Sequence, residues 1–267
     1  YIGNTLVALI FVSPLIWMIS SSLKPEAGIF KGLNSLGTFI PKGASLSNYL
    51  EVFQRIDMWK FIGNSLFYVF VIVVLDLFIN SICGYALAKF EFKGKGLLFG
   101  LIMITMMIPA QVMYVPLFTL MNNIGWANTY QAVVLPGLAG AFGIFLMRQN
   151  MLAFPTSLIE AARIDGCGEI GIFLKVVLPS QKPAVGALGI YMFMSMWNNF
   201  MWPLIILSTK SMYNFPVALA MLDGVAWRKD YGVIMLATVC AVLPIMIIFL
   251  VFQKQFVAGV MGGAVKE

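Results

Sequence analysis

The chain has 267 residues, of which 61% are hydrophobic and 10% are charged, and its mean hydropathy is +0.92. Soluble domains typically carry about 25% charged residues, so this composition excludes an ordinary soluble fold and indicates an integral membrane protein. The net charge of +6 comes from basic residues scattered among hydrophobic runs, which is typical of membrane-flanking segments and does not indicate nucleic-acid binding.

Six apolar stretches are candidates for membrane spans, each of which needs about 20 residues. The predicted spans cover residues 2–20, 61–83, 97–120, 132–147, 184–207 and 233–252. Pro109, Pro116 and Pro136 predict that the third and fourth spans are kinked. We therefore expect an all-α, multi-pass membrane protein that forms one transmembrane domain over residues 1–267.

The connection between the fourth and fifth spans, residues 148–183, contains the one long amphipathic stretch without a membrane-spanning run. Ser157 and Glu160 have the spacing of a capping box, which predicts a short helix from Ser157 to Asp165. Gly166 is placed to end this helix in a left-handed conformation. A second helical run, from Glu169 to Val177, is expected to stop at Leu178-Pro179.

The first of these helices has a distinctive distribution of small residues. Leu158, Ala161, Ala162 and Asp165 follow the spacing of one helical face. Two adjacent alanines would let another surface approach closely. Because a helix of about two turns is marginal by itself, we expect it to pack on its own membrane domain or on a partner protein.

The order of residues in this loop resembles a known family. Glu160-Ala161-Ala162, three residues, Gly166, nine residues and Val176-x-Leu178-Pro179 is similar to the EAA loop of ABC importer permeases, with valine in place of the usual isoleucine. Further similarity, in Gly84-Tyr-Ala-Leu-Ala-Lys89 and Trp197-Asn-Asn-Phe-Met-Trp-Pro203 among others, extends over nearly the whole chain and is closest to carbohydrate permeases of the maltose-permease type.

The resemblance implies that the loop is a cytoplasmic coupling element that docks on a separate ATPase. The implied coupling residues are Glu160, Ala161, Ala162, Asp165 and Gly166. It also implies a second permease subunit and an extracytoplasmic sugar-binding protein as partners, and a location in the cytoplasmic membrane. Basic residues number nine on the implied inner side and eight on the outer side, so the orientation depends mainly on the resemblance.

The chain itself is not expected to be an enzyme. It has no G-x-x-x-x-G-K-[ST] loop to hold ATP, so ATP and Mg²⁺ are expected on the partner ATPase and no cofactor on this chain. Its three cysteines, Cys83, Cys167 and Cys240, are far apart and it has no histidine. Neither a metal site nor a disulfide framework is expected.

Two groups of polar residues are candidates for the substrate path. Asp76, with Asn80 one turn later, lies near the middle of the second span, where an ionisable side chain should face protein or water. The alternative for Asp76 is a hydrogen bond between helices, away from substrate. Trp197, Asn198, Asn199 and Trp202 combine aromatic surface with amides, as sugar recognition requires, but interfacial anchoring and helix-to-helix bonds would use the same residue types.

The sequence favours a sugar or oligosaccharide permease and leaves two other functions open. An importer permease for another solute would share the same loop, although the few charges within the spans argue against a highly charged substrate. An ion-coupled secondary carrier would need ionisable residues inside the membrane. Asp76 is the one residue that supports a carrier of this kind, and such a carrier would leave the EAA loop unexplained.

Overall fold

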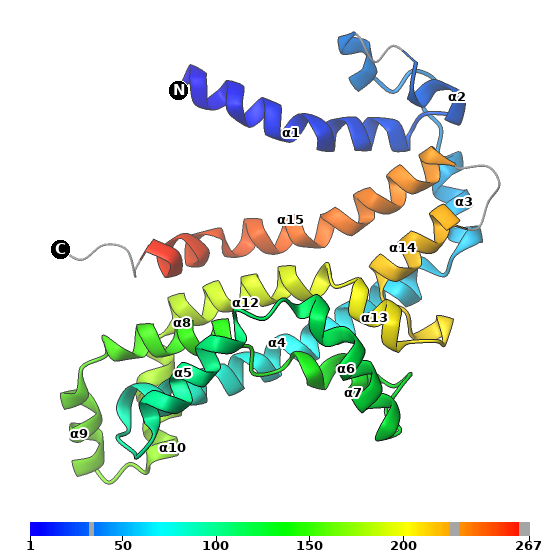
Figure 1. The fold of residues 1–267 in the computed structure, drawn as a ribbon. Coiled ribbons are helices and arrows are strands. Elements are labelled where there is room, and N and C mark those ends of the chain that lie inside the picture. Colours follow the sequence, from blue (N-terminus) through cyan, green and yellow to red (C-terminus); the bar gives the residue numbers. More distant parts are fainter. Residues whose placement is uncertain (32–34, 225–229, 262–267) are drawn as a thin grey trace. The chain divides into compact units, whose positions relative to one another are not determined.

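The computed structural model describes residues 1–31, 35–224 and 230–261, and every regular element within these ranges is a helix (Figure 1). The chain forms two compact units. Unit 1 contains Tyr1–Ser65 and Lys210–Ile247, and unit 2 contains Leu66–Thr209 and Ile248–Glu267. The two long helices α4 (Met58–Lys89) and α15 (Tyr231–Met261) contribute residues to both units.

Unit 1 consists mainly of short helices that pack around a hydrophobic core. Besides the ends of α4 and α15 it contains α1 (Ile2–Ser22), α2 (Glu26–Ile29), η1 (Leu36–Phe39), α3 (Ser47–Arg55), η4 (Lys210–Met212) and α14 (Phe215–Gly224). Its core includes Val52, Phe215 and Leu236. The buried Asn48 amide donates to the carbonyls of Ser22 and Lys24, at 2.8 and 2.9 Å, and so fixes α3 to the end of α1.

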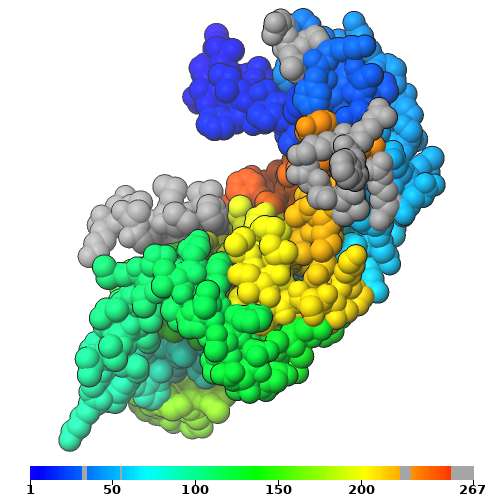
Figure 2. Space-filling view, turned by 45° about the vertical axis from the view of Figure 1, so that its right-hand side comes forward, coloured from blue at the N-terminus to red at the C-terminus, as the bar shows by residue number. Residues whose placement is uncertain are grey.

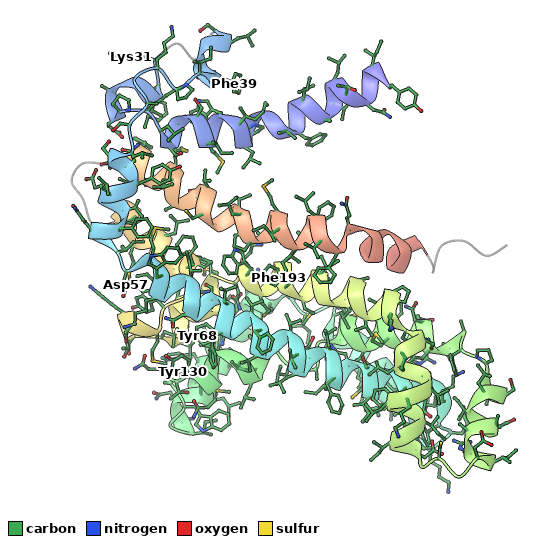
Figure 3. All side chains as sticks on the ribbon, turned by 180° about the vertical axis from the view of Figure 1, so that it is seen from behind. Lys31, Phe39, Asp57, Tyr68, Tyr130 and Phe193 are labelled. Atoms are coloured by element: carbon green, nitrogen blue, oxygen red, sulfur yellow. The ribbon has the colours of Figure 1, made fainter. Side chains whose placement is uncertain are left out.

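Unit 2 contains the helices on either side of the predicted coupling loop. Its elements are α5 (Lys95–Thr105), α6 (Ala110–Asn123), α7 (Tyr130–Val134), η2 (Leu135–Gly137), α8 (Ala141–Leu152), α9 (Thr156–Ile164), α10 (Glu169–Ile172), η3 (Phe173–Val177), α11 (Leu178–Ser180), α12 (Lys182–Trp197) and α13 (Met201–Ile206). In Figure 1, α9 and α10 lie together at one end of this unit. Tyr68 and Tyr130, labelled in Figure 3, bring α4 and α7 together with ring centroids 5.6 Å apart.

The helices agree with the predicted kinks and differ from the predicted ends. Among the described residues, three helices are long and apolar enough to cross a membrane, or five if each of two bent pairs is one span. The bends are 100° between α5 and α6 and 43° between α7–η2 and α8, which confirms both predicted kinks. The stretch 184–207 is divided between α12 and α13, and α15 continues to Met261, past the expected end at 252. Six spans remain a prediction.

Small residues bring α4 and α8 very close. A Cβ atom on Gly84 would lie 2.7 Å from the Cβ of Met147 and 2.9 Å from the backbone nitrogen of Arg148. A Cβ on Gly143 would lie 2.1 Å from the Asn80 amide nitrogen. Glycine at such contacts lets membrane helices approach closely. The backbones of α4 and α8 are therefore packed closely at Gly84 and Gly143.

We expect Gly84→Ala to lower the stability of the protein in detergent by about 1–3 kcal/mol, because the added methyl group would push α4 away from α8. Gly63→Ala is the matched control on the same helix, since nothing lies within 4 Å of its Cβ position. The control should be neutral or slightly stabilising. Thermal unfolding of the purified variants tests this, and equal unfolding temperatures for the two would contradict the contact.

Candidate functional site

Helix α9 starts differently from the sequence prediction. It begins at Thr156, with Pro155 in the N-cap position and no side-chain cap hydrogen bond. The predicted capping box between Ser157 and Glu160 is therefore wrong, because proline already supplies an extended residue before the helix and moves Ser157 into its first turn. Glu160 takes no part in the cap and is exposed.

The end of α9 is as the sequence predicted. Gly166 has φ of +83°, the left-handed conformation that glycine adopts without steric cost. Its N–H donates to the Arg163 carbonyl and the N–H of Cys167 to the Ala162 carbonyl, both at 3.0 Å. These two bonds form a Schellman motif, which turns the chain sharply toward α10.

The two alanines of α9 point in different directions. Ala162 is buried and lies with Ile159 in the core of unit 2, where that core includes Met147 and Met151 of α8. Ala161 is exposed. The sequence predicted one helical face shared by Leu158, Ala161, Ala162 and Asp165, and the structure divides it, with Ala162 in the core and the other three exposed. Adjacent helical residues are about 100° apart, so the edge of the buried face can pass between two alanines.

The outward surface of α9 is more apolar than the sequence analysis recognised. We call it the outer face, made of Leu158, Glu160, Ala161, Ile164 and Asp165, all of them exposed. Ile164 is 86% exposed, and beyond the turn Ile170 is 73% exposed. The spacing of Ile164, three residues after Ala161, was the available signal.

The second half of the loop continues further than predicted. Helix α10 is followed by a π-helical segment, η3, and then by α11, so the helical backbone passes Leu178-Pro179 and ends at Ser180. Pro179 sits in the first turn of α11, where its missing N–H leaves no helical bond unmade. The predicted stop at Pro179 is wrong for this reason.

An ion pair joins α9 to α10 across the turn. The Arg163 Nε donates to Glu169 Oε1 at 2.6 Å, and the Tyr85 hydroxyl of α4 donates to Glu169 Oε2 at 3.4 Å. The hydrogen bond from Arg163 holds the pKa of the Glu169 carboxyl below its ordinary value. The loop is thus tied both within itself and to the helix beneath it.

A buried carboxylate holds the start of α8. Asp76 is fully buried, as expected of an ionisable group at this depth. Its Oδ2 accepts a hydrogen bond from the Asn80 amide at 2.7 Å, and its Oδ1 accepts one from the backbone N–H of Gly140 at 3.4 Å. Gly140 is the N-cap of α8 and follows Ala139, whose φ of +60° is unfavourable for alanine.

The other end of α8 is held by the same long helix. The Lys89 ammonium, at the end of α4, donates to the carbonyls of Leu152 and Phe154. A positive charge at a helix C-terminus is favourable. Helix α4 therefore holds α8 through the Asp76 carboxyl group at one end, the Lys89 ammonium at the other and the close contact at Gly84 between them, and we call this arrangement the α4–α8 clamp.

The remaining predicted residues separate into different environments. Trp197 is 1% exposed and stacks on Phe193 of α12, with ring centroids 5.9 Å apart. The Asn198 amide donates to the Met194 carbonyl of its own helix at 2.8 Å. Asn199 instead lines a cavity in unit 2 together with Trp202, the second tryptophan of the predicted group.

The fold is an all-α membrane protein, and sequence comparison identifies its family as a class of transport permeases. Residues 80–262 match the family described as binding-protein-dependent transport system inner membrane component. The chain belongs to this family. The match includes the α4–α8 clamp from Asn80 onward, the whole of α9 and the cavity.

Characterised relatives and solved structures cover almost the whole chain. It is 39% identical to the arabinooligosaccharides transport system permease protein of Halalkalibacterium halodurans, over 99% of this chain and 95% of the relative. It is 33% identical to the lactose transport system permease protein of Rhizobium radiobacter, over 97% and 92%. A chain from the crystal structure of a bacterial ABC transporter that imports the acidic polysaccharide alginate matches with a TM-score of 0.85 and 26% identity, over 96% of this chain and 94% of that chain.

We expect Asp76→Leu to destabilise the protein strongly, because the Gly140 N–H and the Asn80 amide would lose their acceptor at about 1–3 kcal/mol for each buried group. Asp76→Asn should be much milder. Its oxygen can still accept, and the Asn80 Oδ1, which has no hydrogen-bond partner, can receive the new amide. Thermal unfolding in detergent compares the two variants, and a Leu variant as stable as the unaltered protein would exclude the clamp.

The junction between α9 and α10 should loosen in acid. Because the pKa of Glu169 is lower in the folded protein than its ordinary value of 4.5, its stabilisation is complete above that pH and disappears as the pH falls through the lowered value. In the unaltered protein, hydrogen exchange should show that the amides of α9 lose protection as the pH falls through this range. In Glu169→Gln the amides of α9 should be less protected at neutral pH already, and their protection should not fall further in this range. Glu160→Gln, a carboxylate of the same loop without this contact, should behave as the unaltered protein does.

Proposed function

We propose that this chain is the permease subunit of an ATP-driven importer for a sugar or oligosaccharide, and that it transmits ATP hydrolysis by a separate ATPase through α9. In this proposal ATP and Mg²⁺ bind only to the ATPase. A second, different permease subunit completes the membrane path, and an extracytoplasmic binding protein delivers the sugar. Family membership supports the dependence on a binding protein.

The outer face of α9 is the observation on which the coupling proposal depends. Its inner residues, Ile159 and Ala162, are fixed in the core of unit 2, while Ile164 is almost fully exposed. A group of exposed apolar side chains on one helix, here Leu158, Ala161 and Ile164, is typical of an interaction surface. Ala161 beside it would allow close approach of a cleft wall, and Glu160 would offer a charge-assisted contact.

The route of coupling follows the packing of unit 2. When the ATPase subunits close, a force on α9 would be passed to α8 through the shared core that contains Ile159, Met147 and Met151. The α4–α8 clamp joins α8 to α4 at both ends, so α9 and these helices would move together as a rigid body. The bends at the starts of α6 and α8 are where the path could open.

The sugar part of the proposal draws on the relatives. Those cited above are named for arabinooligosaccharides and for lactose, and further relatives of 30% identity or below are named for trehalose or diacetylchitobiose. An ion-coupled carrier has less support, because Asp76 serves as an acceptor for Asn80 and Gly140 in the clamp.

Two adjacent substitutions test the coupling role directly. Ala161→Leu should leave the unfolding temperature unchanged but weaken co-purification of the ATPase and abolish sugar-stimulated ATP hydrolysis, because the added bulk lies on the outer face. Ala162→Leu should lower stability by about 1–3 kcal/mol, since that bulk enters a packed core. Ile164→Asp should reproduce the loss seen with Ala161→Leu.

Co-purification and ATPase assays on the assembled complex measure these effects, with thermal unfolding as the control for folding. If Ala161→Leu and Ile164→Asp both retained full ATPase binding and uptake, α9 would be only a connector and the coupling proposal would fail.

A further inference from the structure

A cavity of about 590 Å³ lies where three helical breaks of unit 2 meet. The breaks are those between α5 and α6, between η2 and α8, and between α12 and α13. Thr105 and Ala110 line the cavity from the first, Gly137 and Gly140 from the second, and Asn199 from the third. Interrupted helices inside a membrane protein are tolerated where they surround a cavity, and they commonly form substrate sites there.

One end of the cavity is an aromatic wall made of Tyr114 and Trp202. Their rings lie 6.3 Å apart between centroids and are inclined by only 21°. Trp202 is 6% exposed, and its indole N–H donates to the Ala132 carbonyl at 2.9 Å, so it is a fixed support. Tyr114 is half-buried and presents its ring to the cavity. Figure 2 shows α6 and α7, in green, directly against α13, in yellow.

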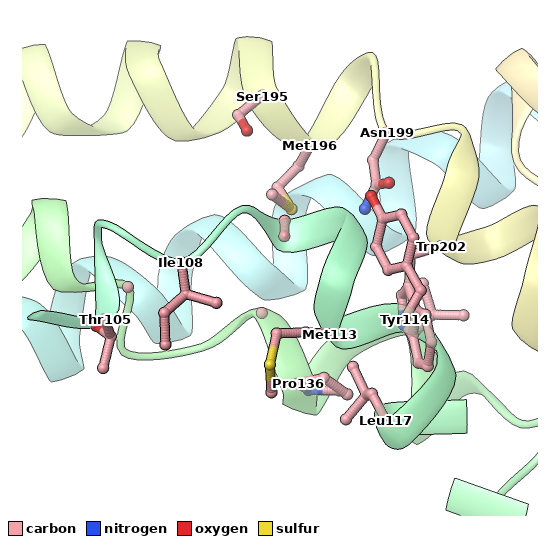
Figure 4. Close-up of a pocket in the computed structure, with 14 residues that line it drawn as sticks. Thr105, Ile108, Met113, Tyr114, Leu117, Pro136, Ser195, Met196, Asn199 and Trp202 are labelled. Atoms are coloured by element: carbon pink, nitrogen blue, oxygen red, sulfur yellow. The ribbon is translucent and has the colours of Figure 1, made fainter. Parts of the chain in front are cut away.

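Hydrogen-bonding groups stand around this aromatic wall. In Figure 4 Asn199 lies at the same end of the cavity as Tyr114 and Trp202, while Thr105 lies toward the other end. The Asn199 amide has both donors and an acceptor, and Ser195 one turn earlier adds a hydroxyl. Apolar ring faces edged by hydroxyls in the plane of the ring are the surfaces of a sugar, and this lining complements both.

The cavity has no formal charge. None of its fourteen lining residues, all within the described ranges, is Lys, Arg, Asp or Glu. The buried Asp76 accepts a hydrogen bond from the backbone of one lining residue, Gly140, but is not itself part of the lining. An acidic saccharide would leave its carboxylates without a cationic partner, at a high desolvation cost.

We infer that this cavity is a saccharide subsite on the transport path, that it takes a neutral sugar, and that Tyr114 and Asn199 contact the ring while Trp202 positions Tyr114. The inference rests on the proposed sugar-importer function and adds to it the subunit's own contact residues and the charge class of the substrate. This class differs from the acidic polysaccharide carried by the alginate transporter that the fold resembles.

Uptake by the assembled complex in liposomes tests the contact residues, with radiolabelled arabinotriose and lactose as neutral probes. Tyr114→Ala and Asn199→Ala should lower the maximal uptake rate of at least one probe about tenfold, whereas Tyr114→Phe should retain most of it. ATP hydrolysis stimulated by the binding protein should be unchanged. Phe118→Ala is the matched control, because Phe118 is an exposed aromatic residue of α6 outside the cavity lining.

Opposite charges placed at Met113, on the cavity lining, test the charge class. For a neutral sugar, Met113→Lys and Met113→Glu should change uptake in the same direction and to a similar extent, because no charge on the ligand distinguishes them. Opposite effects, with lysine favourable, would show an acidic substrate and overturn the inference.

Three further outcomes separate the two proposals. If the unaltered complex transports either probe but Tyr114→Ala and Asn199→Ala transport it normally, the subsite is absent and the importer function stands. If these variants instead lose the second permease during purification, the cavity is a subunit interface and the subsite is again excluded. If the unaltered complex takes up no neutral or acidic sugar at all, the importer function fails, and the subsite fails with it.

Discussion

The hydrogen bonds of Asp76 are the interaction on which the rest of unit 2 depends. The helical path is broken between η2 and α8, so backbone N–H groups at the start of α8 have no helical partners. The buried Asp76 carboxyl group supplies an acceptor to the N–H of Gly140 and itself accepts a hydrogen bond from Asn80. Lys89 completes the arrangement at the far end of α8. Hydrogen bonds with two side chains of α4 thereby fix both ends of α8.

This clamp connects the two places where function is expected. Gly140, held by Asp76, lines the cavity, and the residues after α8 lead within a few positions to α9. The inner face of α9 packs in the core to which α8 contributes Met147 and Met151. A displacement at the outer face of α9 would therefore reach the cavity through packed side chains and a capped helix, with no flexible segment between them.

The loop that contains α9 was largely predictable because its signals are local. The left-handed conformation of Gly166 follows from one glycine at a helix end, and the structure confirms it. The start of α9 was mispredicted because two local signals compete, and Pro155 in the N-cap position prevailed over the Ser157–Glu160 pair. The burial of Ala162 and the exposure of Ala161 could not be predicted. Residue spacing defines the faces of a helix but does not determine which face packs against the core.

The sequence by itself determined that this is an all-α membrane protein with kinked spans, because hydrophobic length and proline position are properties of single segments. It also singled out Asp76 and Asn199, since polar residues within apolar runs are conspicuous. Only the tertiary structure decided what these residues contact. On α8, Asp76 meets the backbone N–H of Gly140, and Asn199 lines the cavity with Tyr114 and Trp202 while Trp197 is buried. Such pairings depend on how distant helices cross, and no spacing along one chain segment encodes that.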